Sequence, residues 1–406
     1  MTAQFTDAPI FDADSHMYES PDALKRHLPE KYQKAVQFVQ VGRHTRIAIR
    51  NRITEFIPNP TFDRVAAPGA HVDFYAGTNT EGKSLRELSG RGIDALPAFR
   101  EPGARLKVLN EQSVDEALVF PTLANLVEHS AAEDPELVVA MIHALNQWML
   151  EQWGYVHENR LFMMPVITLA LVEEAQRELD FVLQSGARGV LVKPAPVKGH
   201  KGWRSPALAE FDPFWRDVEA AGVPVMLHAS QPPLSDYVDL WEPPHTNNFL
   251  DISPFRWAVL GHREVSDMVA SLILHGTLTR FPKLRIGSVE NGSSWIKPLV
   301  HDLQDVYTKM PRELQEDPVK VLRRNLWVSP FWEGSVADVV EQVGWDKVLF
   351  GSDYPHPEGL AEPKDFYRYA EGMDEQRTRD FMGDNCRRLL GLPVKNPAPA
   401  PQPVEA

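Results

Sequence analysis

Eight short runs rich in β-branched and aliphatic residues recur along this chain, and nearly all are bounded by Gly, Pro, Asp or Asn. Their hydrophobicity is continuous rather than alternating, as expected for strands buried on both faces of a parallel sheet. Segments with apolar residues at helical spacing separate the runs. The runs span residues 9–16, 114–121, 160–169, 187–195, 223–230, 284–291, 325–330 and 346–353. A strand and a helix repeated eight times predict an α/β fold, the (β/α)8 TIM barrel.

One interval departs from this repeat. Residues 20–110, between the first two runs, are far longer than a usual βα connection. They contain a hairpin-like pair of segments, 34–42 and 44–54, and a polar, Gly-containing stretch. We therefore expect a long insertion after strand 1, which serves either as a lid or pocket wall or as an oligomer contact. Residues 1–395 are predicted to form one barrel domain, and the Pro-rich residues 396–406 a disordered tail.

Composition excludes several classes of partner. The net charge of −14 over 406 residues repels phosphates, so we expect no binding to nucleic acid or to anionic membrane surfaces. No run approaches the ~20 apolar residues of a membrane span, and the N-terminus lacks the basic start and apolar core of a signal peptide. The single cysteine, Cys386, has no partner for an internal disulfide. These features are typical of a soluble, cytoplasmic protein.

Side chains that can bind metal stand at the ends of several runs. Asp14 and His16 end the first run, His228 the fifth, Glu290 the sixth and Asp353 the eighth. All strand ends of one polarity meet at one face of a barrel, so these remote residues are expected to converge on a cation. Carboxylate and imidazole ligands suit one or two divalent ions such as Fe, Zn or Mn, and no cysteine lies near to select a thiolate-bound metal.

Each of these residues also has an ordinary structural explanation. Asp14 could cap a loop, and His16 could bond a backbone carbonyl. His228 alone would more often be a satisfied core histidine than a ligand, and Glu290 could bond backbone amides where a loop begins. Asp353 is the strongest single candidate, because a carboxylate buried at a strand end without a cation or a donor is costly.

Taken in order, these residues resemble the amidohydrolase superfamily. The similarity also rests on the segments LTRFPKLRIGSVENGSSW, FGSDYPHPEG and GDNCRRLLGL, and it extends over residues 9–392. It is closest to the amidohydrolase-related branch that includes aminocarboxymuconate semialdehyde decarboxylase and resorcylate decarboxylases. The resemblance implies that Asp14, His16 and His228 are metal ligands, and that Asp353 binds metal and moves protons. Two positions depart from the family pattern: Asp14 replaces the first His of the usual His-x-His, and Glu290 stands where a His is common.

The resemblance suggests two further candidates for catalysis. Lys193 ends the fourth run, where binuclear amidohydrolases carry a lysine, often carbamylated, that bridges two ions. It could instead attract a substrate carboxylate, which is the role we favour. His356 follows Asp353 closely enough to line the same site, either as a proton shuttle or substrate contact or in a purely structural role in the loop.

Three functions are compatible with this pattern. The first is hydrolysis of an amide, ester or acyl thioester by a metal-activated water, with Asp353 taking the water's proton. A narrower likeness to an actinobacterial diiron thioesterase of diterpenoid antibiotic biosynthesis favours the thioester. The alternative is non-oxidative decarboxylation of an aromatic or unsaturated carboxylic acid, in which Asp353 protonates the ring carbon. The third is a ligand-binding barrel without catalysis.

Glu290 separates the first two functions, because contact with a second ion would favour hydrolysis. The resemblance further implies a small-molecule acyl or carboxylate substrate and a homodimer.

Overall fold

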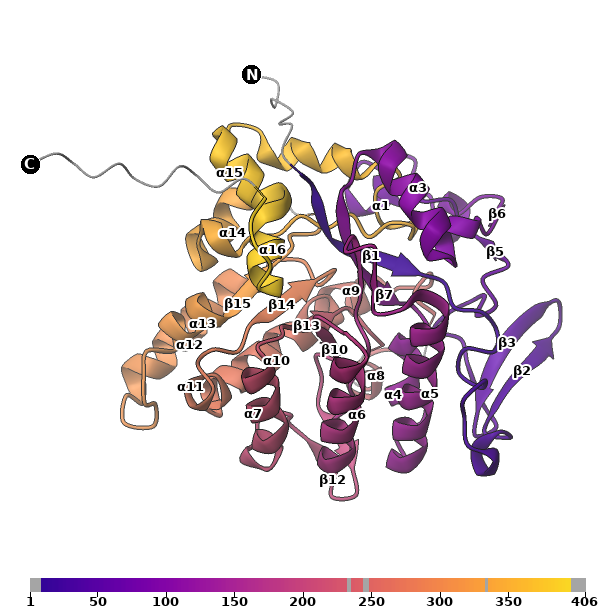
Figure 1. Cartoon of the computed structure of the whole chain (residues 1–406), viewed down its shortest axis with the longest axis horizontal. Coiled ribbons are helices and arrows are strands. Elements are labelled where there is room, and N and C mark those ends of the chain that lie inside the picture. Colours follow the sequence, from indigo (N-terminus) through magenta and orange to yellow (C-terminus); the bar gives the residue numbers. More distant parts are fainter. Residues whose placement is uncertain (1–8, 232–234, 244–247, 333–334, 396–406) are drawn as a thin grey trace, which may run out of the picture.

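Two mainly parallel four-stranded sheets form the centre of the molecule (Figure 1). The computed structural model describes residues 9–231, 235–243, 248–332 and 335–395, so the predicted tail lies outside the described residues. One sheet has the order β1-β7-β9-β8, with bounds Phe11–Met17, Glu116–Pro121, Leu161–Met163 and Val156–His157. The other has the order β10-β13-β14-β15, with bounds Val190–Val192, Val225–His228, Ile286–Val289 and Leu326–Val328. Among the described strands of these two sheets, only β8, at one edge, runs antiparallel to its neighbour.

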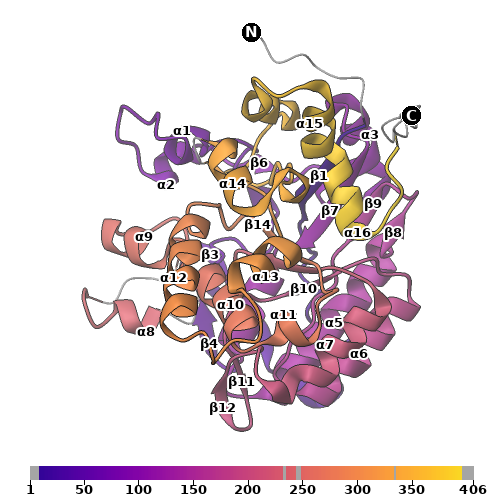
Figure 2. The same ribbon diagram turned by 90° about the vertical axis from the view of Figure 1, so that its left-hand side faces the viewer.

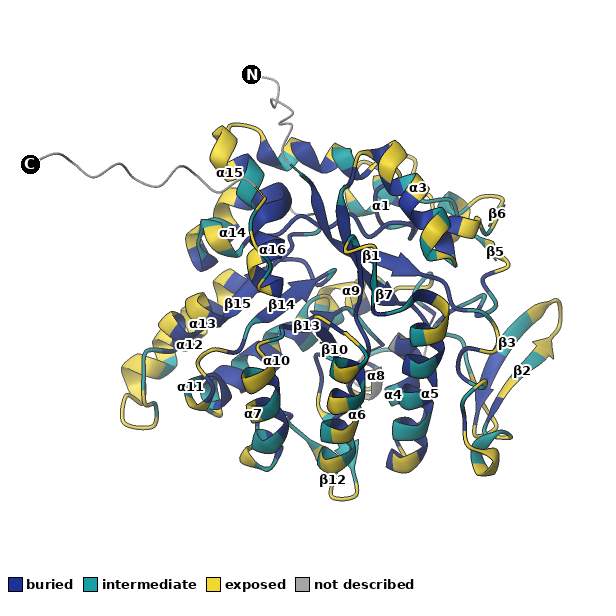
Figure 3. Ribbon diagram, viewed as in Figure 1, coloured by how far each residue is buried: buried dark blue, intermediate teal, exposed yellow. Residues whose placement is uncertain are grey.

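Helices surround these strands on the outside (Figures 1 and 2). Seven of them follow the strands in the predicted alternation: α5 (Pro135–Trp153), α6 (Val172–Gln184), α7 (Asp212–Ala221), α10 (Arg263–Leu274), α12 (Ile296–Lys309), α14 (Val336–Val343) and α16 (Asn385–Leu390). Figure 3 shows the central strands fully buried and the helices exposed on their outer faces. This is the layering of a TIM-barrel-type α/β fold.

Additional helices and 3-10 segments connect these elements. The helices are α3 (Pro102–Gln112), α4 (Ala124–Ser130), α8 (Ser235–Val238), α9 (Pro254–Leu260), α11 (Thr277–Arg280), α13 (Pro318–Asn325) and α15 (Glu375–Arg379). The 3-10 segments cover Glu30–Tyr32, Pro97–Phe99, Ala209–Phe211, Trp345–Lys347 and Pro363–Ala370, and a π-helical turn covers Asp380–Asp384. A two-stranded ribbon, β11 (Val197–Gly199) and β12 (Gly202–Arg204), follows β10.

Local sequence signals explain where helices begin and end. The side chain of Asp134 accepts a hydrogen bond from the Leu137 amide, and Pro135 occupies the first turn of α5. Both are favoured at helix N-termini, where backbone amides lack partners inside the helix. Helix α7 ends at Gly222, whose left-handed backbone angle, φ +63°, costs glycine little.

The predicted eighth strand, over residues 346–353, does not form as a continuous strand. Residues Trp345–Lys347 adopt a 3-10 turn, and the following segment makes isolated bridges from Val348 to Val328 and from Tyr354 to Ser15. Its backbone forms hydrogen bonds with the strands on both sides: the Leu349 amide donates to the Val328 carbonyl of β15, and the Ala13 amide of β1 donates to the Phe350 carbonyl. The two sheets therefore approach each other through this segment without joining into one closed sheet.

Asp12 holds this segment against β1 rather than pointing toward the ends of the other strands. Its carboxylate accepts hydrogen bonds from the amide and the hydroxyl of Ser352, and the Asp353 amide donates to the Asp14 carbonyl at 2.7 Å. The β1–β7 register shifts between Asp12 and Ser15, which breaks the strict alternation expected of β1. This clamp sets the position of Asp353 relative to Asp14 and His16.

The chain between β1 and β7 carries small elements of its own. A three-stranded antiparallel sheet contains β2 (Val36–Val41), β3 (His44–Ile49) and β4 (Arg52–Thr54), which confirms the predicted hairpin. This hairpin projects at the right-hand edge of Figure 1. The remaining elements are β5 (Arg64–Val65), β6 (Ile93–Asp94), α1 (Val72–Tyr75) and α2 (Leu85–Leu88). The segment returns to the barrel where the His71 amide donates to the Pro357 carbonyl at 2.7 Å.

Within the described ranges, no helix has both the length and the apolar character needed to cross a bilayer.

Gly351 tests how tightly the clamped segment packs on β1. A Cβ at this position would lie 2.8 Å from the Cβ of Asp14 and 2.7 Å from the Oγ of Ser329. We expect Gly351→Ala to lower the free energy of unfolding by about 1–3 kcal/mol through overpacking, as measured by urea denaturation. Gly103→Ala, in α3 with open space around it, is the matched control and should not destabilise the protein. Equal stability of Gly351→Ala and the wild type would contradict this packing.

Candidate metal centre

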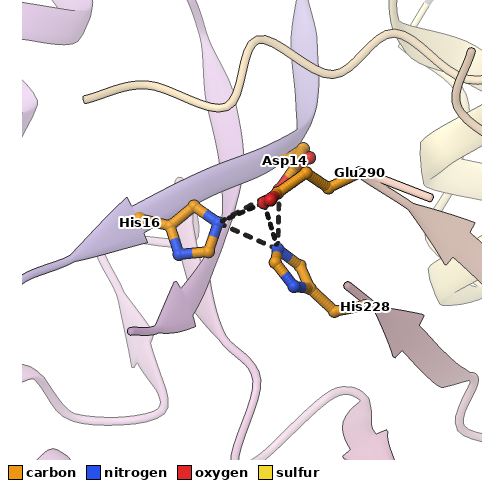
Figure 4. Close-up of side chains that lie close together, drawn as sticks. All are labelled: Asp14, His16, His228 and Glu290. Atoms are coloured by element: carbon orange, nitrogen blue, oxygen red, sulfur yellow. Dashed lines mark hydrogen bonds and ion pairs between the residues drawn. The ribbon is translucent and has the colours of Figure 1, made fainter. Parts of the chain in front are cut away.

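Four side chains from three strand ends meet in the middle of the molecule (Figure 4). Asp14 and His16 lie on β1, His228 ends β13, and Glu290 follows β14 directly. Their nearest nitrogen and oxygen atoms all lie within 4.8 Å of one another. The two Nε2 atoms of His16 and His228 are 2.9 Å apart, and Glu290 Oε2 lies 2.9 Å from that of His228 and 3.4 Å from that of His16. The convergence expected from strand ends is present.

The orientation of His228 suits a metal ligand. Its Nδ1 lies 2.7 Å from the Ala229 carbonyl, which can only accept, so Nδ1 carries the proton of that hydrogen bond. In the neutral ring Nε2 then presents a lone pair toward His16, Asp14 and Glu290. Histidine ligands are usually held in this way, with the other ring nitrogen donating to a carbonyl or carboxylate.

Asp353 and His356 extend the cluster on one side. Asp353 Oδ1 lies 3.4 Å from His16 Nε2 and 2.8 Å from His356 Nδ1. The latter pair lacks the alignment of a hydrogen bond, as when two groups face a common point. The hydroxyl of Thr122 donates to the Met17 carbonyl, and it lies 3.1 Å from His356 Nε2. His356 Nε2 therefore donates to Thr122 Oγ1, and its Nδ1 lone pair faces Asp353.

The buried polar atoms of this cluster lack partners that would offset their burial. Asp14 Oδ1, Glu290 Oε2 and both carboxyl oxygens of Asp353 make no hydrogen bond in the part of the chain that the structure describes. Asp14 and Asp353 are at most 1% exposed. Several carboxylates buried so close together are strongly unfavourable unless a positive charge compensates them. The residues therefore fit a divalent cation coordinated by Asp14, His16, His228 and Glu290.

The negative charges buried in this cluster also shift the pKa values of His228 and Asp353. Burial lowers the pKa of His228, but the charges of Glu290 and Asp14 outweigh it and raise the pKa well above its usual range. Burial and the charges of Glu290 and Glu358 raise the pKa of Asp353 well above its usual range. A proton on His228 and a metal ion compete for the same Nε2 lone pair, so ion binding at this centre releases protons.

The geometry provides one complete ligand set. His16 and Glu290 belong both to the group with Asp14 and His228 and to a second group with Asp353 and His356. His16 faces both groups with the same Nε2 atom, and a nitrogen lone pair binds one ion. Two full sets therefore cannot be filled at the same time.

Glu290 and Asp353 both adopt left-handed backbone angles, with φ of +55° and +57°. Such angles are uncommon for residues with a Cβ and cluster at functional sites. In each case the turn comes where the chain leaves the barrel interior, and it directs the carboxylate back toward His16.

Lys193 lies apart from this cluster. Burial lowers its pKa, and the charges that oppose the shift belong to Glu128 and Glu264. It lines a separate hollow with Glu128 and Thr168, and no ion pair joins it to the cluster carboxylates among the described residues. Lys193 is therefore not positioned to bridge two ions at this centre. Its expected role toward a substrate carboxylate stays a prediction.

A cavity of about 350 Å³ opens beside the cluster. Glu290 and His356 line its inner end, and most of its wall is aromatic or aliphatic, including Tyr18, Phe56 and Phe62. Tyr18 stacks on Phe62 with ring centroids 4.6 Å apart. Much of this wall comes from the segment between β1 and β7. The cavity is large enough for a single-ring organic acid, in the range typical of small-molecule sites.

Three polar residues near the site are not identified by any sequence pattern. Thr122 orients His356, and His71 and Glu358 line the cavity. His71 lies in the segment between β1 and β7, and Glu358 lies in the loop after Asp353. No motif or strand end marks them, because they reach the site through loop conformation. Only the position of Thr122, directly after β7, offered a signal.

Comparison with known proteins places this geometry in a family. The amidohydrolase family model matches residues 70–392. The chain belongs to the amidohydrolase family. An amidohydrolase from Mycobacterium avium subsp. paratuberculosis K-10 has a similar crystal structure, with a TM-score of 0.90 and 36% identity over 95% of this chain and 100% of that one. The protein is thus an enzyme of the amidohydrolase superfamily.

Two relatives of named activity are decarboxylases. A 2-amino-3-carboxymuconate-6-semialdehyde decarboxylase from Dictyostelium discoideum is 24% identical over 343 residues, 79% of this chain and 83% of that protein. The 5-carboxyvanillate decarboxylase from Novosphingobium aromaticivorans DSM 12444, solved with manganese, has a TM-score of 0.57 and 16% identity over 95% of this chain and 97% of that one. The latter likeness concerns the fold.

These comparisons contradict the predicted hydrolase. The prediction that the enzyme cleaves an amide, ester or acyl thioester is wrong, because the curated relative is a decarboxylase. The narrower likeness to a thioesterase is not shown. The physical error lay in Glu290, whose carboxylate suggested a second ion, whereas it approaches the same two imidazole nitrogens that Asp14 faces.

Removal of the ion tests the centre directly. We expect dialysis against a chelator to destabilise the protein and added Mn²⁺ to restore about 3 kcal/mol at an ion concentration ~100 times its Kd. His228→Ala should abolish this restoration in thermal unfolding experiments. His301→Ala, at an exposed position of α12, should leave it unchanged. An undiminished response to Mn²⁺ in His228→Ala would show that the ion binds elsewhere.

Proposed function

We propose that this enzyme is a metal-dependent, non-oxidative decarboxylase of an aromatic or unsaturated carboxylic acid. The observation that carries the proposal is a buried carboxylate, Asp353, placed beside a cation site and 2.8 Å from His356, which lines a largely apolar cavity. The decarboxylase relatives support the same reaction. A small organic acid fits the size and the apolar wall of the cavity.

The chain would hold a divalent cation with Asp14, His16, His228 and Glu290. When bound, that ion would fix the substrate carboxylate and neutralise its charge next to the buried ligands. Manganese is a reasonable occupant, because carboxylate ligands suit it and the 5-carboxyvanillate decarboxylase was solved with manganese.

Asp353 would supply the proton that completes the reaction. Loss of CO₂ breaks a carbon–carbon bond and leaves the electron pair on the ring or alkene carbon, which must then accept a proton. Burial and the surrounding negative charges favour the protonated carboxyl of Asp353, although a bound cation opposes that shift. His356, held by Thr122 with its Nδ1 lone pair toward Asp353, would orient this carboxyl and relay its next proton.

We assign the segment between β1 and β7 to the pocket wall. Phe56, Phe62 and Tyr75 of this segment line the cavity together with residues of the barrel. An apolar wall excludes water from the carbon that receives the proton and strengthens electrostatic interactions inside the site.

Asp353→Asn tests the proton donor. We expect kcat for CO₂ release to fall by at least ~100-fold, because an amide cannot deliver the proton. Asp14, His16, His228 and Glu290, the set that the structure brings together, remain, so the Mn²⁺ content by elemental analysis should match that of the wild type. Solvent deuterium should appear at the former carboxyl position of the wild-type product. Full turnover by Asp353→Asn would remove this residue from proton transfer.

Metal stoichiometry provides an independent check. Because His16 Nε2 can serve only one ion, we expect one equivalent of divalent metal per chain after saturation and removal of the excess. Two tightly held equivalents would contradict the single ligand set.

A further inference from the structure

Two buried polar atoms in the cavity wall face each other across a gap. His71 Nδ1 and Glu358 Oε2 are 3.9 Å apart, too far for a hydrogen bond, and neither has a hydrogen-bond partner among the described residues. The His71 side chain is fully buried, and that of Glu358 is 13% exposed. Buried polar groups in folded proteins are usually paired, so an open pair in a pocket wall points to an absent partner.

Hydrogen bonding fixes what His71 can offer. The hydroxyl of Ser89 donates to the Leu85 carbonyl at 2.9 Å, so Ser89 Oγ accepts from His71 Nε2 at 2.8 Å. Burial lowers the pKa of His71 to about 4, which keeps the ring neutral at pH 7. Nδ1 is therefore an acceptor. The atom that fills the gap must donate a hydrogen bond to Nδ1.

The chain builds this gap from two distant segments. His71 precedes α1, and its amide donates to the Pro357 carbonyl, next to Glu358. The Gly69 amide lies 3.4 Å from the His356 carbonyl, to which it donates. The backbone thus attaches the segment between β1 and β7 to the loop that carries Asp353, His356 and Glu358. His71, Ser89 and Glu358 line the same cavity as Glu290 and His356.

We propose that His71 and Glu358 form a subsite for a hydrogen-bond-donating substituent of the substrate, a hydroxyl or an amino group, separate from the carboxylate that is lost. This inference rests on the proposed decarboxylation. A hydroxyl would donate to His71 Nδ1 and accept from a protonated Glu358 carboxyl, whereas an amino group would donate to both. Because His71 Nδ1 and Glu358 Oε2 are 3.9 Å apart, one such atom can lie at an ordinary hydrogen-bond length from both.

The subsite predicts discrimination between ring acids that differ in one group. Binding to the manganese-loaded protein is measured by calorimetry for 2-hydroxybenzoate and for its 2,3-, 2,4- and 2,5-dihydroxy and 4-amino-2-hydroxy analogues. We expect at least one substituted analogue to bind ~10-fold or more tightly than 2-hydroxybenzoate, because that parent compound leaves both wall groups unpaired. A preference for the hydroxyl over the amino analogue would assign the donor as a hydroxyl, and the reverse preference as an amine.

Two variants locate the effect. We compare the affinity for the preferred analogue with the affinity for 2-hydroxybenzoate. In His71→Leu and in Glu358→Met this ratio should fall to about one, while His301→Leu, the exposed control, should retain the wild-type ratio. The wild-type comparison stands even if a variant does not fold. Equal affinities across the analogues, or no binding by any of them, would overturn the subsite.

CO₂ release from the same compounds separates the two proposals. Discrimination in binding without CO₂ from any analogue would contradict the decarboxylase and leave the subsite. CO₂ release without discrimination in binding would contradict the subsite and leave the decarboxylase.

Discussion

The burial of several carboxylates around two imidazoles is the interaction on which the rest of this structure depends. Asp14, Glu290 and Asp353 lie within 3.5 Å of His16 Nε2, deep between the strands. Such a group of charges is unfavourable without a cation, and the surrounding fold holds it in place. The register shift of β1, the clamp of Asp12 on Ser352 and the left-handed turns at Glu290 and Asp353 all serve to bring these groups together.

The site divides its acids by environment. Asp14 and Glu290 lie with the two imidazoles and suit a metal ion, whereas Asp353 is fully buried beside His356, where its pKa is raised. Similar carboxylates can thereby take different roles, one set as ligands and one as a proton carrier, because burial and neighbouring charges decide which form each adopts. The apolar cavity wall and the unpaired side chains of His71 and Glu358 could bind the part of a substrate that does not contact the metal ion.

Much of the fold could be read from hydrophobic runs, because a strand buried on both faces must be continuously apolar. Seven of the eight runs contain a strand, and the hairpin after β1 forms as expected. The run ending at Asp353 differs: its backbone makes hydrogen bonds to the segments on both sides but forms no continuous strand. Lys193 shows the same limit for side chains: its place after a strand was correct, but the local carboxylates Glu128 and Glu264 surround it instead of the metal ligands.

The sequence by itself determined the chemistry available: which carboxylates and imidazoles stand at the ends of apolar runs, and hence that a cation site is expected. Tertiary structure decided which of them share a centre, that one nitrogen lone pair limits that centre to a single ligand set, and that His71 and Glu358 face the same cavity. The reason is geometric. Periodicity along a strand defines which residue comes last, but distances between strand ends and loops depend on register shifts, turns and contacts between segments hundreds of residues apart.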